Sequence, residues 1–300
     1  MHTSYLLLLQ PFYSYLQFEK RYSQHTLISY QTDLEQFFGY LSTEYGAPEL
    51  NAIKYALIRS WLAAQKNQGI SARSINRKIS SLKSFFKYQL KTGVIAATPM
   101  TTVITPKNGK RLPEFVQEKD LADLFQYLSF PEDWKGKTDR LVLELFYHSG
   151  MRLSELVNLK ESQVDSSRSQ IKIVGKGNKE RVVPIAGPLV KTIEAYMAEK
   201  RKILEAPDLK HLFVLPTGKK LYNKYVYLAV KQYLGQVTTL NKKSPHILRH
   251  SFATHLTNNG ANINAVKELL GHSSLAATQV YTHNSIEKLK EAYKKAHPKA

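Results

Sequence analysis

The chain of 300 residues contains no cysteine, which excludes disulfide bonds and thiolate metal sites and permits a reducing compartment. Long apolar runs are also missing. The stretch from Tyr5 to Leu9 is far too short to span a bilayer, and it lacks the basic flank and cleavage site of a signal peptide. These absences predict a protein without a membrane segment that resides in the cytoplasm.

Acidic residues are scarce: 24 Asp and Glu stand against 43 Lys and Arg, which gives a formal net charge of +19. Residues 1–110 hold 13 basic and 5 acidic residues, and the remainder holds 30 and 19. Because both halves are basic, the charge does not belong to a detachable tail. It predicts salt-dependent attraction to a polyanion, although a merely basic soluble protein remains an alternative.

Residues 1–105 show helical periodicity and no strand-like alternation. The most informative predicted helix runs from an N-cap at Ser71 to a C-terminal cap at Gly93. Its buried stripe is predicted to comprise Ile75, Ile79, Leu82, Phe85, Phe86 and Leu90. The opposite face carries cations and serines, which suit contacts with DNA phosphates, although a solvated surface would look the same. The candidate DNA-binding residues on that face are Arg73, Arg77, Lys83 and Lys87.

Residues 106–113 contain two prolines, a glycine and three cations, and this composition is typical of an exposed linker. We therefore expect two domains, a helical DNA-binding domain over 1–105 and a second domain over 114–300.

The second domain carries the candidate chemistry. Arg152 opens a short predicted helix, where the helix dipole disfavours a cation unless a partner such as Glu155 or a bound phosphate compensates. Residues 170–174 and 180–184 alternate as the two strands of a β-hairpin. Lys176 lies in its glycine-rich turn, where it can reach a ligand or simply remain solvated.

Ser244 and Pro245 predict the start of another helix, on which His246 and Arg249 share a face near the positive N-terminus. A further helix is expected over 263–270. The histidines invite a metal interpretation, but the H-E-x-x-H pattern and an acidic cluster are both missing from the sequence.

Taken together, the candidate groups are two guanidiniums, one ammonium, two imidazoles and one phenol, and such a set suits metal-free attack on a phosphodiester. A phenol with a pKa near 10 is barely ionised at neutral pH, so a nearby base and positive charge would be needed. The residues in question are Arg152, Lys176, His246, Arg249, His272 and Tyr281.

Four motifs, in order and spacing, resemble those of the tyrosine recombinase (phage integrase) family, and specifically its Xer-type branch. They are Ser149-Gly150-Met151-Arg152-Leu153-Ser154-Glu155-Leu156, Gly175-Lys176-Gly177-Asn178-Lys179-Glu180-Arg181, His246-Ile247-Leu248-Arg249-His250 and Leu270-Gly271-His272 with Tyr281-Thr282-His283. The resemblance implies a mainly α fold with a small β-sheet. It implies a helical, SAM-like core-binding domain that clamps DNA, followed by a mixed α+β catalytic domain.

The resemblance also implies roles. Tyr281 would attack the scissile phosphate and form a 3′-phosphotyrosyl link, Arg152 and Arg249 would bind the phosphate, and Glu155 would support Arg152. The histidines His246 and His272 would assist proton transfer, and Lys176 would protonate the leaving oxygen. Neither ATP nor a metal cofactor is expected, because the covalent link keeps the bond energy.

The implied partners are double-stranded DNA with a specific site and a tetramer of recombinase protomers that acts through a Holliday junction. The other protomers are either copies of this chain or a second, non-identical recombinase, and a DNA-translocating activator is a further candidate partner. Residues 286–296 are predicted to form a short amphipathic helix with Ile286, Leu289 and Tyr293 on one face. The resemblance implies that this helix docks on a neighbouring protomer, although packing on its own domain remains the alternative. The implied role is resolution of chromosome dimers at cell division. The alternatives are an integrase or transposon recombinase, a type IB topoisomerase, and a non-catalytic DNA-binding protein.

Overall fold

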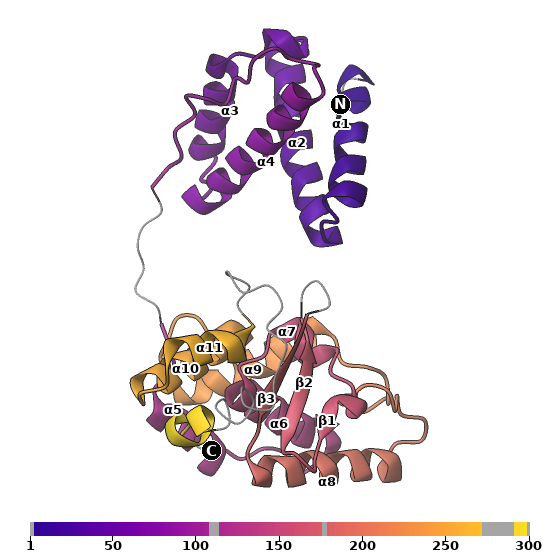
Figure 1. Cartoon of the computed structure of the whole chain (residues 1–300), viewed down its shortest axis with the longest axis vertical. Coiled ribbons are helices and arrows are strands. Elements are labelled where there is room, and N and C mark those ends of the chain that lie inside the picture. The colour runs from indigo at the N-terminus through magenta and orange to yellow at the C-terminus, as the bar shows by residue number, and fades with distance from the viewer. Residues whose placement is uncertain (1–2, 108–113, 176–178, 272–290, 299–300) are drawn as a thin grey trace. The chain divides into compact units, whose positions relative to one another are not determined.

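The computed structural model describes residues 3–107, 114–175, 179–271 and 291–298. The chain divides into two compact units, Met1–Arg111 and Leu112–Ala300 (Figure 1). Each unit has its own hydrophobic core. No helix in these described ranges is both long and apolar enough to cross a membrane.

The described residues of the N-terminal unit form helices joined by turns and loops, without a β-strand. Its α-helices are α1 (Thr3–Ser14), α2 (Gln24–Tyr45), α3 (Tyr55–Asn67) and α4 (Ala72–Lys91), with a π-helical turn at Tyr15–Glu19 and a 3₁₀ turn at Leu50–Ala52. Helix α1 agrees with the helical pattern predicted for residues 1–105, although the sequence pattern did not give its bounds. Aromatic rings from α1, α2 and α4 fill the core. The rings of Phe12 and Phe85 pack edge to face, with 5.5 Å between their centroids.

Helix α4 confirms most of the expected pattern. The Ser71 side chain accepts a hydrogen bond from the backbone N–H of Ser74 at 3.3 Å, and Gly93 takes the left-handed conformation that ends the helix. The expected stripe is buried apart from Leu90, which is 40% exposed. Arg73, Lys83 and Lys87 are exposed, as a DNA-facing surface requires.

Arg77 has a partner that its own helix does not reveal. Its Nη1 lies 2.8 Å from a carboxylate oxygen of Asp33 on α2. Asp33 is fully buried, and it also accepts hydrogen bonds from Lys78 and Ser81. A buried carboxylate needs such donors, so Arg77 is a structural ion-pair partner as well as a surface cation.

The C-terminal unit combines helices with one small sheet (Figure 1). Its helices are α5 (Glu118–Gln126), α6 (Trp134–Ser149), α7 (Leu153–Val157), α8 (Gly187–Ile203), α9 (Asn223–Val237), α10 (Pro245–Asn258) and α11 (Ile263–Leu270), with a 3₁₀ turn at Glu161–Gln163. The almost wholly buried α6 packs against α8, α9 and α10 and is the centre of the core. The mainly α fold with a small sheet is therefore confirmed.

The sheet consists of three antiparallel strands in the order β1 (Val164–Asp165), β2 (Gln170–Val174) and β3 (Glu180–Pro184). The predicted hairpin is confirmed with its strand boundaries, and its register pairs Ile173 with Arg181 and Val174 with Glu180. Strand β1 was not predicted, because two residues are too few to show alternation.

The end of the chain packs on its own unit. Residues 291–296 are helical, and Tyr293 and Ala296 are each 2% exposed within the C-terminal core. Tyr293 is hydrogen-bonded to Nδ1 of His148 at 3.0 Å, and Nε2 of His297 lies 3.1 Å from the carbonyl oxygen of Tyr147. The apolar side chains of Tyr293 and Ala296 are thus buried by their own unit, and docking of the C-terminal helix on a neighbouring protomer stays a prediction. Residues 286–290 lie outside the described ranges.

Candidate active site

The backbone between α6 and α7 places Arg152. Helix α6 ends at Ser149, and Gly150 reverses the chain with a φ of 55°. A Cβ at Gly150 would lie 2.4 Å from the ring of Phe252, so only glycine fits this turn. Arg152 then takes the N-cap position of α7 in an extended conformation.

Glu155 fixes Arg152 at two points. One carboxylate oxygen accepts the backbone N–H of Arg152 at 2.7 Å, and the other accepts its Nη1 at 2.8 Å. The ion pair expected from the sequence is therefore present. The side chain of Arg152 is 39% exposed, so part of its guanidinium remains available to a ligand.

Arg249 approaches the same place from α10, but it is only 5% exposed. Its Nη1 donates to the carbonyl oxygen of Gly150, and its Nη2 donates to that of Leu270 at 2.7 Å. Burial, followed by the charges of Arg152 and Arg181, lowers the pKa of Arg249 to about 10. A bound anion would relieve this unfavourable clustering of positive charge.

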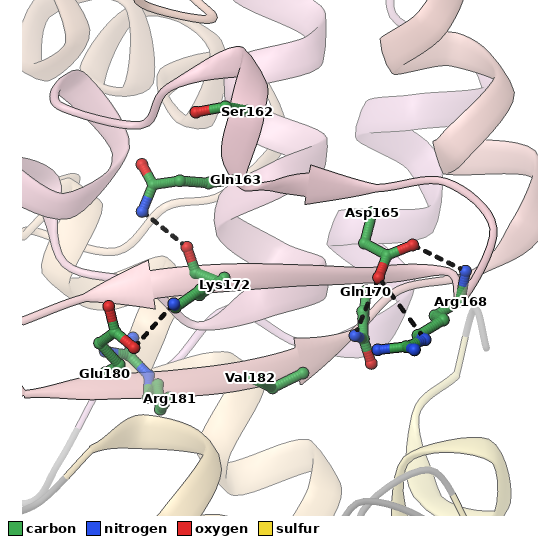
Figure 2. A pocket seen from close by; sticks show the side chains of 9 residues that line it. All are labelled: Ser162, Gln163, Asp165, Arg168, Gln170, Lys172, Glu180, Arg181 and Val182. Atoms are coloured by element: carbon green, nitrogen blue, oxygen red, sulfur yellow. Dashed lines mark hydrogen bonds and ion pairs between the residues drawn. The ribbon is translucent and has the colours of Figure 1, made fainter.

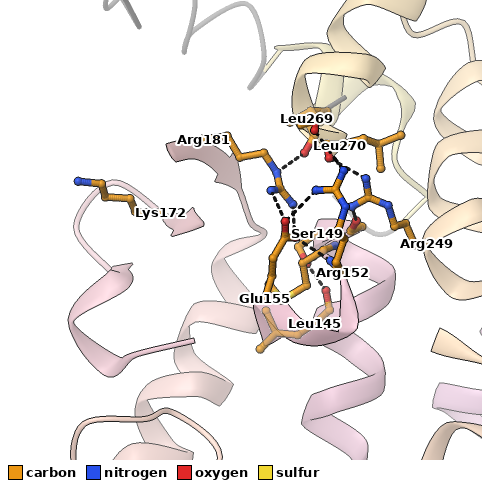
Figure 3. A network of polar contacts seen from close by, with 12 residues as sticks. Leu145, Ser149, Arg152, Glu155, Lys172, Arg181, Arg249, Leu269 and Leu270 are labelled. Atoms are coloured by element: carbon orange, nitrogen blue, oxygen red, sulfur yellow. Dashed lines mark hydrogen bonds and ion pairs between the residues drawn. The ribbon is translucent and has the colours of Figure 1, made fainter. Parts of the chain in front are cut away.

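A third arginine, Arg181, completes the cluster, and its part in the site is not evident from the sequence motifs. Arg181, on β3, is 4% exposed, and its guanidinium grips Glu155 with two bonds of 3.0 and 2.8 Å (Figure 3). Burial alone would raise the pKa of Glu155, but the hydrogen bonds and charge of Arg181, with those of Arg152, lower it to about 2. The carboxylate therefore stays ionised. In the sequence, the one feature that pointed to Arg181 was its position as the last residue of the motif that begins at Gly175.

The C-terminal end of α11 joins the three arginines (Figure 3). Its last carbonyl groups have no partner within the helix and carry the negative end of the helix dipole. Three consecutive carbonyls, hereafter the α11 carbonyls, each accept from a different arginine. Leu269 accepts from Arg181 at 2.7 Å, Leu270 from Arg249 at 2.7 Å, and Gly271 from Arg152 at 3.2 Å.

Of the four remaining predicted site residues, the structure describes only His246. His246 is exposed in the first turn of α10, three residues before the buried Arg249. Lys176, His272 and Tyr281 lie outside the described residues. The chain is described up to Gly271 and on both sides of the hairpin turn, where the backbone N–H of Gly175 donates to the carbonyl of Lys179 at 2.7 Å.

Two other histidines of α10 do not join the arginine cluster. Burial, and then the charge of His246, lowers the pKa of His250. His255 is buried, and its Nδ1 lies 3.2 Å from the hydroxyl of Tyr147. Within the described ranges, no three histidine or carboxylate side chains are grouped so that they could hold a metal ion.

A polar hollow of about 410 Å³ lies along the sheet (Figure 2). Its charges neutralise one another: Lys172 pairs with Glu180 at 2.8 Å, and Asp165 lies 3.9 Å from Arg168. The hollow therefore offers little net charge to an anion, and the arginine cluster is the better candidate for phosphate binding.

A basic helical unit followed by an α+β unit with this arginine cluster defines the class of DNA strand-transfer enzymes. The sequence pattern of the phage integrase family matches residues 114–288, and that of the phage integrase N-terminal SAM-like domain matches residues 9–93. The chain belongs to the phage integrase family and is a Xer-type, site-specific tyrosine recombinase.

Curated relatives support this assignment over nearly the whole length. The chain is 39% identical to tyrosine recombinase XerC of Chlorobaculum parvum, with 97% of this chain and 94% of the relative covered. It is 36% identical to tyrosine recombinase XerC of Bacillus licheniformis, with 96% and 95% covered.

Solved structures share the fold. The XerH site-specific recombinase bound to its difH substrate, in a pre-cleavage complex, is similar with a TM-score of 0.69 and 24% identity over 89% of this chain and 78% of that one. A lambda integrase dimer bound to a COC′ core site is similar with a TM-score of 0.66 and 16% identity over 91% and 98%.

Proposed function

We propose that this recombinase cuts and rejoins double-stranded DNA at a specific site through a 3′-phosphotyrosyl link to Tyr281. The observation that carries the proposal is the convergence of Arg152 and Arg249, from segments 97 positions apart in the sequence, on the α11 carbonyls that precede His272. Two guanidiniums held in this way suit the non-bridging oxygens of one phosphate.

The charge of the cluster suits the reaction. Three guanidiniums face one ionised carboxylate, which leaves two fixed positive charges in a largely buried place. A phosphodiester carries one negative charge, and the pentacoordinate state formed by phenolate attack carries two. The cluster therefore stabilises the transition state more than the ground state, which is the condition for catalysis.

The remaining roles follow the family motifs. His246 and His272 assist by hydrogen bonding and proton transfer, and Lys176 donates the proton to the leaving 5′ oxygen. Because the phosphotyrosyl link conserves the bond energy, the reaction proceeds without ATP or a metal ion. Arg73, Arg77, Lys83 and Lys87 on α4 contact DNA phosphates.

In the cell, the protein would act in the cytoplasm on bound DNA, in a tetramer that exchanges strands through a Holliday junction. The similarity to XerC relatives favours resolution of chromosome dimers, with a second, paralogous recombinase and a DNA-translocating activator as partners. Integration of a mobile element by the same chemistry is the second candidate, since the lambda integrase shares the fold.

The test begins with selection of bound DNA from a random pool, which supplies the site sequence. A duplex of that sequence with a nick next to the cleavage position traps the covalent intermediate, because the short cleaved fragment diffuses away. The wild-type protein should give a protein–DNA adduct that survives SDS, and Tyr281→Phe should bind the duplex and give none. An adduct that persists in Tyr281→Phe would contradict the assignment of the nucleophile.

A further inference from the structure

Arg181 is a buried cation that shares Glu155 with Arg152, and each of the two arginines also donates to a different one of the α11 carbonyls. Its fork takes both oxygens of Glu155, and its Nε donates to the first of the α11 carbonyls. Since Arg181 is 4% exposed and these bonds occupy its Nε and both terminal nitrogens, its guanidinium is directed at protein groups. Arg249 is as deeply buried, but it bonds only to backbone carbonyls and keeps an uncompensated charge for a phosphate. The charge of Arg181 is compensated by Glu155, so Arg181 acts on a substrate through its neighbours.

Because Arg181 and Arg152 share Glu155, the position of Arg181 limits how Arg152 can bind that carboxylate. A carboxylate and a guanidinium that meet alone prefer a bidentate pair with two parallel hydrogen bonds. Here the fork of Arg181 takes that arrangement, and Arg152 is left with a single side-chain bond to Oε1. The guanidinium of Arg152 therefore keeps its bond to Gly271 and its exposed edge.

We propose that Arg181 is a positioning residue of the recombination reaction: by occupying Glu155 as a bidentate partner, it prevents Arg152 from doing so and holds the Arg152 guanidinium toward the phosphate. The proposal rests on the proposed function of Arg152 as a phosphate-binding residue. Without Arg181, the guanidinium of Arg152 turns onto Glu155 and forms the bidentate pair itself. Arg152 and Glu155 then neutralise each other, and Arg152 no longer faces the phosphate.

The contacts of Gly271 with Arg181 support the same coupling. A Cβ added at Gly271 would lie 3.1 Å from Cδ and 3.2 Å from Nη1 of Arg181. One added at Gly175, at the end of β2, would lie 3.3 Å from Oε1 of Glu155 and 3.8 Å from Nη1 of Arg181. Glycine at both places lets the hairpin and the end of α11 close around this guanidinium.

The experiment measures single-turnover cleavage of the nicked duplex, at saturating protein, alongside equilibrium binding to the same duplex. Arg181→Met keeps the bulk of the side chain and removes the fork. We expect cleavage to slow by about 10- to 100-fold, by analogy with the loss of a partner that orients a metal-binding side chain. Binding should change by less than about threefold, because phosphate contacts along the duplex dominate affinity.

A double-mutant cycle separates positioning from general damage. If Arg181 acts by occupying the carboxylate, its loss should matter little once the carboxylate is gone. Glu155→Gln with Arg181→Met should therefore cleave no more slowly than Glu155→Gln alone. Additive losses in the double variant would overturn the proposal.

Lys200 offers a matched control, because it is another fully buried cation, paired with Glu161 and hydrogen-bonded to the carbonyl oxygens of Asp208 and His211. Lys200→Met should lower the melting temperature without slowing cleavage at temperatures where the protein is folded. Equal slowing by Lys200→Met would show that lost stability explains both variants, and would overturn the proposal.

Arg181→Lys serves if the methionine variant fails to fold. Its ammonium keeps the charge but cannot span both oxygens of Glu155 and the α11 carbonyl. It should fold and still cleave at least about tenfold more slowly, whereas wild-type cleavage would overturn the proposal. Absence of any adduct with the wild-type protein would instead count against the proposed function.

Discussion

Arg152 and Arg249 are the same residue type in two different environments. Arg249 is buried between two backbone carbonyls, and its pKa is lowered to about 10 chiefly by that burial. Arg152 is partly exposed and keeps donors for a ligand. In the proposed phosphate-binding pair, Arg249 is therefore the fixed member and Arg152 the adjustable one. The partners of Arg152 then decide how well the two guanidiniums are placed for a phosphate.

Glu155 should make the stability of the protein depend on acid. Its folded pKa, about 2, lies below its usual value of 4.5 because Arg181 and Arg152 outweigh the effect of burial. Its contribution to stability is thus fully present above about pH 4.5 and is lost as the pH falls toward 2. Glu155→Gln should lower the free energy of unfolding at pH 7 by about 3–5 kcal/mol, since it breaks a buried pair. Urea titrations at pH 7 and pH 3 measure both effects.

The matched control is Glu199→Gln, because Glu199 pairs with Lys137 where both side chains are partly exposed. Its cost at pH 7 should stay below about 1 kcal/mol. The difference in unfolding free energy between wild type and Glu155→Gln should shrink at pH 3. A difference that stays constant between the two pH values would show that the carboxylate charge is not the cause.

At the scale of elements, the end of α11 organises the site more than any strand does. An α-helix leaves its last carbonyls without partners, and here those carbonyls serve as acceptors for three arginines that enter from β3, α7 and α10. The helix dipole favours cations at this end. The C-terminal end of α11 therefore fixes the positions of three side chains that come from separate segments of the chain.

Gly271 tests that role of α11, and Gly260 provides the control. Both have positive φ, +62° and +84°, so alanine strains the backbone at either position by roughly 1–2 kcal/mol. A Cβ at Gly260 meets nothing within 4 Å, whereas one at Gly271 presses on Arg181. We expect both variants to lose similar stability in thermal melts, but only Gly271→Ala to cleave the nicked duplex about tenfold more slowly. Equal cleavage rates would argue against coupling through α11.

The sequence predicted elements far better than it predicted contacts. Periodicity placed α4, the hairpin strands and α11, because each depends on local hydrophobic patterning and capping. It could not assign Arg181, whose partners lie 26 and 88 positions away and are brought together only by folding. The partner of Arg77 on α2 was missed for the same reason.

For the C-terminal segment, the sequence predicted the apolar face but could not identify the surface that covers it. Its amphipathic spacing correctly indicated an apolar face with Tyr293, but periodicity cannot say which surface covers that face. In the structure the covering surface includes His148 of α6 in the same chain. Amphipathicity therefore indicates that a partner exists, and only the fold identifies it.

At the scale of the whole molecule, the formal net charge of +19 is the main long-range property. On DNA, each neutralised phosphate releases condensed counterions, so the logarithm of affinity falls with the logarithm of salt concentration by about 0.9 per contact. We therefore expect a steep slope for the wild-type protein. Three of the exposed cations of α4 that have no acidic partner in the described structure are Arg73, Lys83 and Lys87. Changing all three to glutamine should reduce the slope by roughly 3, measured as site affinity between about 50 and 200 mM salt.

Two further variants, a triple lysine substitution and a single arginine substitution, distinguish a DNA-contacting surface from an effect of net charge. Changing three exposed lysines on and after α8 to glutamine removes the same net charge, and because bulk charge is screened by salt, the slope should change by less than about 1. Those lysines are Lys191, Lys202 and Lys210. Arg77→Gln should instead lower the unfolding free energy, because it leaves the buried Asp33 one donor short. If the α4 and α8 sets reduced the slope equally, the N-terminal unit would contribute only its net charge, and α4 would not be a DNA-contacting surface.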